Sequence, residues 1–238
     1  MSGHSKWSQI KHKKAITDAR RSKIFSKLAA MISIAVRKGG KDPESNPSLR
    51  LAIEKAKEFN MPKENIERAI QRGSGELAGT KLEEITYEAY GPGGIGILIK
   101  TITDNKNRTA GEIKKILNEN DGKLAESGSV SFQFEEKSFL TIAKNDFSED
   151  LCLSLIEKGM EGFEEREEEI IIFSQPKNFS SLKQFLEEKN VKILSTGLEP
   201  VAKQKQEVGQ EIKKKLEKLF EELEEQNEVE EIYSTLKV

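Results

Sequence analysis

The 238-residue sequence has little of what disulfides, metal sites and membrane spans require. Its single cysteine, Cys152, cannot form an intramolecular disulfide, so we expect a reducing, cytoplasmic setting. A structural zinc site needs about four Cys/His-type ligands at short spacings, and the chain has only two histidines, so we expect no metal site. No stretch approaches the roughly 18 apolar residues of a transmembrane helix, and residues 1–15 lack the apolar core of a secretory signal. We therefore expect no membrane partner.

Groups that could perform catalysis are equally scarce. Both histidines, His4 and His12, lie in the N-terminal segment, whereas Cys152 lies on a predicted helix far away in the sequence. The acidic run Glu164–Glu169 is more simply a solvated strand edge than a cation site, because negative charge there prevents edge pairing. The turn Gly91–Gly94 matches neither the phosphate-binding nor the dinucleotide-binding glycine pattern. We expect a protein that is not an enzyme and uses no cofactor.

What the sequence does have is an uneven distribution of charge. Residues 1–79 carry 17 basic and 8 acidic side chains, whereas residues 80–238 carry 22 basic and 33 acidic ones. Within residues 1–41 there are 11 basic side chains and a single acidic one, Asp18. Such asymmetry indicates a polyanionic partner for the N-terminal end, and the acidic remainder would be repelled by that partner.

The basic segment supplies the candidate nucleic-acid contacts. Phosphate chains bind such surfaces by counterion release, whatever the base sequence, and a tryptophan ring can stack on an unpaired base. The predicted contacts are Lys6, Trp7, Lys11, His12, Lys13, Lys14, Arg20, Arg21, Lys23, Lys27, Arg37, Lys38 and Arg50. Lys13, Arg20 and Lys27 recur every seven residues, which predicts one stripe along a helix, away from its apolar face. A solvated helix face is the alternative interpretation, and the spacing does not distinguish DNA from RNA.

A second candidate is the stretch DNKNRT, which runs from Asp104 to Thr109 between a predicted strand and a predicted helix. Asn105 and Asn107 can cap the helix N-terminus, where exposed N–H groups also accept anions. Arg108 would add a phosphate contact. All three are candidate anion contacts, but structural capping is the favoured interpretation.

The hydrophobic pattern predicts a multi-domain α and α+β protein. Apolar residues at helical spacing predict helices over 15–38, 47–60 and 62–72, which close a small three-helix core before a linker at 73–80. Beyond the linker, apolar residues alternate with polar ones, as in strands, and one helix lies between the predicted strands. The expected elements are strands 85–89 and 95–99, a helix 108–119 and a strand 130–134.

The C-terminal half has a recognisable order of elements. Residues 138–200 follow a β-α-β-β-α-β order, which is that of the ferredoxin-like unit, and a helix and a strand end the chain near 212–223 and 229–233. Because the strands before residue 135 have only one helix to cover them, we expect the terminal helix and strand to complete their layer. The predicted domains are a basic helical domain, 1–79, a discontinuous α+β domain, 80–135 plus 204–238, and an inserted ferredoxin-like domain, 136–203.

Six stretches occur in the order of a known family: GHSKWSQIKHKKAITDARRSKIFSKL, DPESNPSLRLAIEKAKEFNMPKENIERAIQRGSG, YEAYGPGG, TDNKNRT, ESGSVSF and NEVEEIYSTL. Through these stretches the chain resembles the YebC/PmpR family over nearly its whole length. The resemblance is weakest across residues 136–195. The resemblance implies three domains, with the third inserted, and no established catalytic residues. Ser48 stands where the family commonly has arginine, so one basic residue is lost from any shared surface.

The resemblance also implies a function. Bacterial members are described as cytoplasmic, DNA-binding transcriptional regulators, whereas other members, including mitochondrial relatives, act on translation at the ribosome. We therefore expect a DNA-binding transcriptional regulator with phosphate contacts from residues 6–38 and Arg50, although no helix-turn-helix signature is evident. The alternative is an RNA- or ribosome-associated translation factor that activates translation or relieves stalling. A hydrolase that uses clustered carboxylates is disfavoured.

Overall fold

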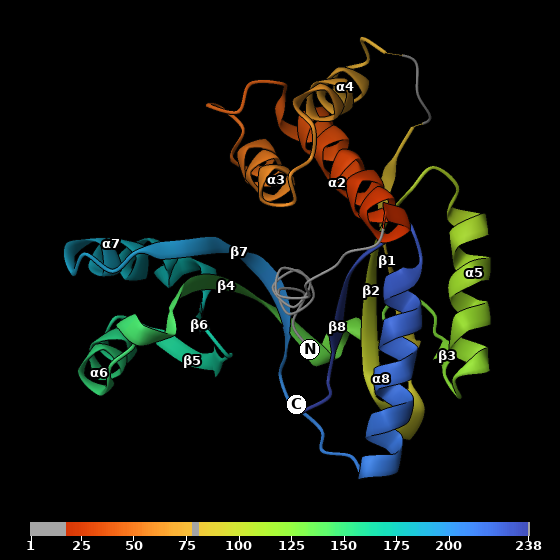
Figure 1. Ribbon diagram of the computed structural model, residues 1–238. Helices are drawn as coiled ribbons and strands as arrows, with labels where there is room; N and C mark the ends of the chain where they lie inside the picture. The colour runs from red at the N-terminus through yellow and green to blue at the C-terminus, as the bar shows by residue number, and fades with distance from the viewer. Residues whose placement is uncertain (1–17, 78–80, 238) are drawn as a thin grey trace. The chain divides into compact units, whose positions relative to one another are not determined.

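A computed structural model of the protein describes residues 18–77 and 81–237, with side chains from Arg21 onward. The chain divides into two compact units (Figure 1). One consists of Phe132–Gln204, and the other contains the described residues before and after that segment. The predicted fold class, helical and α+β domains in one chain, is confirmed. The three domain boundaries stay predictions.

The first unit begins with three helices around a common apolar core. They are α2 (Asp18–Gly39), α3 (Pro47–Glu58) and α4 (Lys63–Ser74). Leu28 and Ile32 of α2 are fully buried in this core with Leu49 of α3. Asn46 caps α3, because its Oδ1 accepts the N–H of Leu49 while its Nδ2 donates to the carbonyl of Ala35 at 2.8 Å. This buried amide therefore joins the end of α2 to the start of α3.

The same unit contains a four-stranded antiparallel sheet in the order β3-β1-β2-β8. Its strands are β1 (Glu83–Tyr90), β2 (Gly96–Thr103), β3 (Lys123–Leu124) and β8 (Val229–Ser234). The helices α5 (Lys106–Glu119) and α8 (Gln210–Glu225) pack against each other and share a core with the sheet. In α8 four apolar residues at helical spacing are buried: Leu216, Leu219, Phe220 and Leu223.

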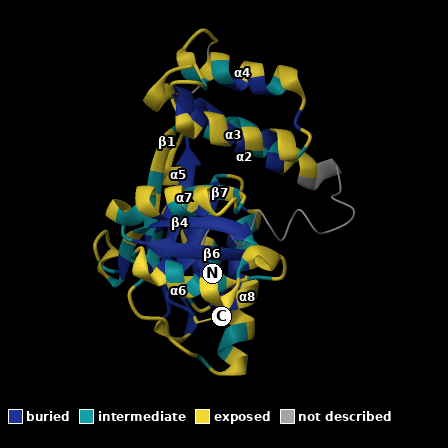
Figure 2. Cartoon of the chain, turned by 90° about the vertical axis from the view of Figure 1, so that its left-hand side faces the viewer, coloured by how far each residue is buried: buried dark blue, intermediate teal, exposed yellow. Residues whose placement is uncertain are grey.

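The second unit has the strand order β5-β6-β4-β7, also fully antiparallel. Its elements follow the predicted β-α-β-β-α-β order. They are β4 (Phe134–Ala143), α6 (Glu149–Glu157), β5 (Met160–Glu165), β6 (Glu169–Ser174), α7 (Phe179–Glu188) and β7 (Ile193–Ala202). Leu155 of α6 and Leu182 of α7 pack on Leu140 and Ile172 of the sheet, and β4 and β6 are largely buried (Figure 2).

The predicted strand at 130–134 is wrong. Val130 lies in a turn, a short 3-10 helix occupies Ser131–Gln133, and β4 begins only at Phe134. The cause is the carboxylate of Glu88 in β1. It accepts the backbone N–H groups of Val130 at 2.5 Å and Ser131 at 2.9 Å, which removes the donors that strand pairing there would need.

No helix in the described part of the chain is both long enough and apolar enough to span a membrane.

Candidate nucleic-acid interface

Two lysines of the predicted interface are engaged within the fold. Lys27 is only 5% exposed, and its Nζ donates to the carbonyl oxygens of Glu224 at 2.9 Å and Val229 at 2.6 Å. The Nζ of Lys23 lies 3.3 Å from the carbonyl oxygen of Glu225. The last carbonyls of a helix have no partner within it and form the negative end of its dipole. Both lysines therefore cap the end of α8.

The C-terminal end of α2 is held in a similar way. Arg37 donates through Nη1 to the carbonyl oxygen of Leu82 at 2.6 Å, and Lys38 forms an ion pair with Glu84 at the start of β1. Both side chains stay exposed, so these contacts are not buried anchors. With Lys23 and Lys27, four of the predicted phosphate contacts therefore hold α2 to the end of α8 or to the start of β1.

For Lys27 the prediction needs correction. A buried ammonium that donates to two carbonyls has no route to a phosphate without breaking those bonds, so Lys27 does not belong to an exposed basic stripe. Lys6, Trp7, Lys11, His12, Lys13 and Lys14 lie outside the described residues. Arg20 lies in α2, but its side chain is also outside the description. Lys27 is thus the one member of the stripe whose side chain the structure describes.

Arg21 and Arg50 are exposed, on α2 and α3 respectively. Arg21 lines an open groove of about 480 Å³ between α2 and α4. Two further arginines line the same groove, Arg68 and Arg72 of α4, one helical turn apart. Both are exposed, and none of the described residues that line the groove is acidic.

Sequence reasoning missed Arg68 and Arg72. The signal was present, because their four-residue spacing places them on one face of the helix, beside the buried Ala69 that lines the same groove. The excess of basic residues within 1–41 indicated α2 instead of α4. Only the packing of α4 on α2 brings these arginines beside Arg21.

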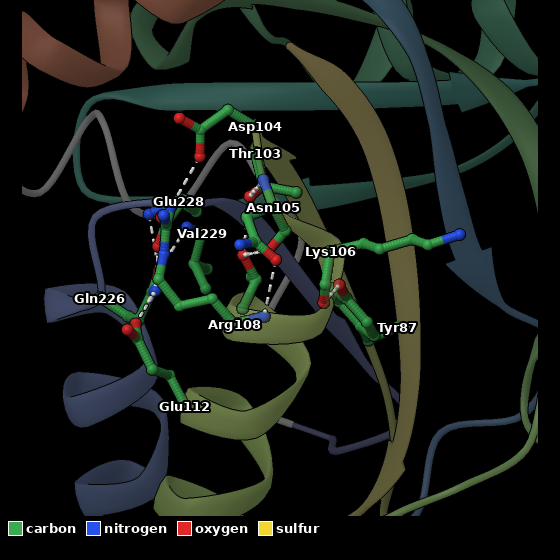
Figure 3. Close-up of polar contacts among 11 residues, drawn as sticks. Tyr87, Thr103, Asp104, Asn105, Lys106, Arg108, Glu112, Gln226, Glu228 and Val229 are labelled. Carbon is green, nitrogen blue, oxygen red and sulfur yellow. Dashed lines mark hydrogen bonds and ion pairs between the residues drawn. The ribbon is translucent and has the colours of Figure 1, made fainter. Parts of the chain in front are cut away.

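The DNKNRT stretch proves to be structural (Figure 3). Asn105 caps α5 by accepting the N–H of Arg108 at 3.1 Å, which confirms the favoured interpretation. The guanidinium of Arg108 pairs with Asp104 at 2.8 Å and with Glu228, and the hydrogen bonds it donates to them raise the pKa of Arg108 above its usual value. Asn107 is exposed in the first turn of α5. Because two carboxylates already neutralise Arg108, the structure argues against a phosphate contact there.

Gln226 extends this cluster at the turn between α8 and β8. Its side chain donates to Glu112 of α5 at 2.6 Å and also to Glu228, while its amide oxygen accepts the N–H of Val229 at 3.0 Å (Figure 3). The motif thus ties the start of α5 to the turn that precedes β8. Across residues 18–77 and 81–237, no three His, Cys, Asp or Glu side chains converge in a way that would hold a metal ion.

Comparison with known proteins shows what the chain is similar to. A family model described as the TACO1/YebC protein N-terminal domain matches residues 5–76, and one described as the TACO1/YebC second and third domain matches residues 82–236. A relative from Halothermothrix orenii is 46% identical over 242 residues, which cover all of this chain and 96% of the relative. One from Dictyoglomus thermophilum is 45% identical over 240 residues, with the same coverage. Both are named "Probable transcriptional regulatory protein".

A solved structure supports the same relationship. The crystal structure of a conserved hypothetical protein from Aquifex aeolicus matches with a TM-score of 0.82 and 41% identity. The match covers 98% of this chain and 96% of that protein. The chain therefore belongs to the TACO1/YebC family, in which its relatives carry the name of transcriptional regulators.

Proposed function

We propose that the protein is a cytoplasmic, DNA-binding transcriptional regulator that holds its nucleic acid with the basic N-terminal end. One observation carries this proposal: the exposed cations of α2 and α4 meet in a groove whose described lining contains no acidic residue. The names of the relatives support the regulatory role.

Binding would rest mainly on phosphate contacts. Each neutralised phosphate releases condensed counterions, so affinity falls as salt rises, whatever the base sequence. Residues 80–238 carry an excess of 11 acidic side chains, 33 against 22. This excess repels the same phosphates and would restrict docking to the N-terminal end.

A second candidate function is that of an RNA- or ribosome-associated translation factor. The half-buried ring of Phe25 in the groove favours it, because unpaired bases can stack on aromatic rings and folded RNA offers many such bases. A cationic end on an acidic body also suits insertion into an RNA cleft. Neither function requires an active site, and we propose that the protein is not an enzyme.

Fluorescence anisotropy with a labelled oligonucleotide, titrated at several salt concentrations, tests nucleic-acid binding. The variant Lys11→Glu with Lys14→Glu should bind more weakly and give a flatter dependence of log K on log salt. Lys114→Glu with Lys115→Glu on α5 changes the net charge by the same amount at exposed positions away from the groove, and it should keep most of the slope. Unchanged affinity and slope in the first variant would exclude the basic segment from the interface.

Sedimentation of a cell lysate at low salt separates the two functions. A DNA-binding regulator should stay clear of the ribosomal fractions, whereas a translation factor should migrate with ribosomal subunits. Nuclease treatment restricted to RNA should release the protein from those fractions only in the second case.

A further inference from the structure

The groove between α2 and α4 combines two kinds of surface. Its rim carries three guanidinium groups, from Arg21, Arg68 and Arg72. Its floor is apolar, with Phe25 half-buried at the edge of the helical core and Met61 almost fully buried. A plain phosphate-binding surface needs the first feature but has no use for the second.

The arginine pair on α4 is suited to an anion. Arg68 and Arg72 carry like charges at i and i+4, an arrangement that is unfavourable in a helix until an anion lies between the two groups. Neither makes an ion pair with any residue that the structure describes. Guanidinium groups bind phosphate oxygens in pairs of parallel hydrogen bonds, which gives direction as well as charge.

The remaining lining residues suit a nucleotide rather than a bare phosphate. Ser22, Ser26 and Asn65 supply hydroxyl and amide groups beside the apolar floor. Side chains of these types hydrogen-bond the edges of bases and the hydroxyls of sugars. The volume of about 480 Å³ lies within the ~300–1,000 Å³ typical of sites for small organic ligands.

A duplex would use only part of this surface. Its bases are paired and stacked, so a duplex would place phosphates on the arginines and leave Phe25 and Met61 uncovered. An unpaired nucleotide can place its phosphate on the arginines and its base against the apolar floor.

We propose that the groove between α2 and α4 binds one unpaired nucleotide of a nucleic-acid strand. The phosphate lies between Arg68 and Arg72, and the base lies over Phe25. This inference rests on the nucleic-acid binding that both proposed functions share. It deepens that proposal, because it assigns the base-contacting site to α2 and α4 and selects single strands over duplexes.

The test uses the full-length protein and three fluorescein-labelled 12-mers of one sequence: single-stranded RNA, single-stranded DNA and duplex DNA. The wild type should bind a single strand at least about tenfold more tightly than the duplex. Arg68→Ala with Arg72→Ala should lower single-strand affinity roughly ten- to hundredfold and remove that preference. The ratio between the RNA and DNA strands then identifies the sugar that the site accepts.

Matched variants separate this site from general electrostatic attraction. Lys57→Ala with Lys63→Ala also removes two exposed cations from α3 and α4, but neither lysine lines the groove, so the single-strand preference should remain. Arg68→Lys with Arg72→Lys keeps the charge and loses the paired donor geometry, so it should retain the salt slope and lose most of the preference. Phe25→Leu keeps an apolar side chain in the core and should weaken single-strand binding only.

Each failure has a distinct meaning. Equal affinity for strand and duplex, together with equal losses in the arginine and lysine variants, overturns the groove and leaves the proposed function standing. A wild-type protein that binds none of the three 12-mers at low salt overturns the proposed function itself. Thermal unfolding of each variant confirms that it is folded, which is expected because both arginines are exposed helical residues.

Discussion

The ammonium nitrogen of Lys27 lies 2.6 Å from the carbonyl oxygen of Val229, a residue 202 positions later in the chain. This contact divides the basic residues of the N-terminal end into two groups. Lys23 and Lys27 hold α2 to the end of α8, whereas Arg21 faces a groove together with Arg68 and Arg72. The side chains of both groups are cationic, but the first group stabilises the packing of α2 and the second lines the groove.

We expect Lys27→Met to destabilise the protein by about 1–3 kcal/mol for each carbonyl left without a donor. The methionine can fill the space of the lysine stem, but it cannot donate to Glu224 or Val229. Urea unfolding measures this loss. Lys63→Met, at an exposed position of α4, should change stability by less than about 0.5 kcal/mol. A folded Lys27→Met protein should bind nucleic acid with the affinity of the wild type. Reduced affinity in a variant as stable as the wild type would show that Lys27 contacts the nucleic acid.

Arg108→Ala should leave nucleic-acid affinity and its salt dependence unchanged. The guanidinium is already neutralised by Asp104 and Glu228, so its removal takes no free positive charge from the surface. A small fall in melting temperature is expected, because Arg108 links the start of α5 to the turn before β8. Anisotropy titrations measure the affinity. A loss as large as that of the Arg68 and Arg72 variant would show that the DNKNRT stretch does contact the ligand.

Two glycines in helices should respond to alanine in opposite directions. A Cβ at Gly73 of α4 would lie 2.6 Å from the carbonyl oxygen of Ser33 and 2.7 Å from Cβ of Val36, so α4 would have to move away from α2. We expect Gly73→Ala to cost about 1–3 kcal/mol. A Cβ at Gly111 of α5 meets no atom within 4 Å, so Gly111→Ala should stabilise the protein by about 0.5–1 kcal/mol. The denaturant midpoints of the two variants measure these changes in stability. A stabilised Gly73→Ala protein would contradict the close packing of α4 on α2.

Glu88 should make the stability depend on pH in the acid range. Burial alone would raise the pKa of this carboxyl, but backbone N–H groups of Gly128, Val130 and Ser131 donate to it and lower its pKa below the usual value of 4.5. A carboxyl whose pKa is lower in the folded state contributes stability that is present above 4.5 and lost as pH falls through the folded pKa.

The test for Glu88 is urea unfolding of the wild type and of Glu88→Gln between pH 7 and pH 3. The variant should lose about 1.5–3 kcal/mol at pH 7, because a neutral amide accepts these hydrogen bonds less strongly than a carboxylate. Its stability should then fall less steeply than that of the wild type below pH 4.5. Parallel curves at every pH would mean that Glu88 is not ionised in the fold.

Much of the architecture follows from local patterns in the sequence. The helices α3 and α5 and the strand pair β1–β2 agree with their predicted positions within a few residues, because their apolar periodicity matches their burial. The strand predicted at 130–134 failed for a reason that periodicity cannot supply. A carboxylate more than 40 residues earlier takes the N–H groups that the strand would have used.

The candidate site was predicted less well than the fold. Net charge indicated a cationic surface at the N-terminal end of the chain, but it could not tell a basic side chain that caps a distant helix, such as Lys27, from an exposed one, such as Arg21. Lys27 and Arg21 are six residues apart on one helix, and only tertiary packing separates their surroundings. The contribution of α4 depended in the same way on its packing against α2.

The most direct test of nucleic-acid binding by the N-terminal end is ultraviolet cross-linking. The full-length protein is irradiated with a single-stranded oligonucleotide, and the cross-linked peptides are identified by mass spectrometry. We predict cross-links within residues 1–77, including the peptide that contains Phe25, and their loss in the Arg68→Ala, Arg72→Ala variant. Cross-links confined to residues 81–237 would contradict the account.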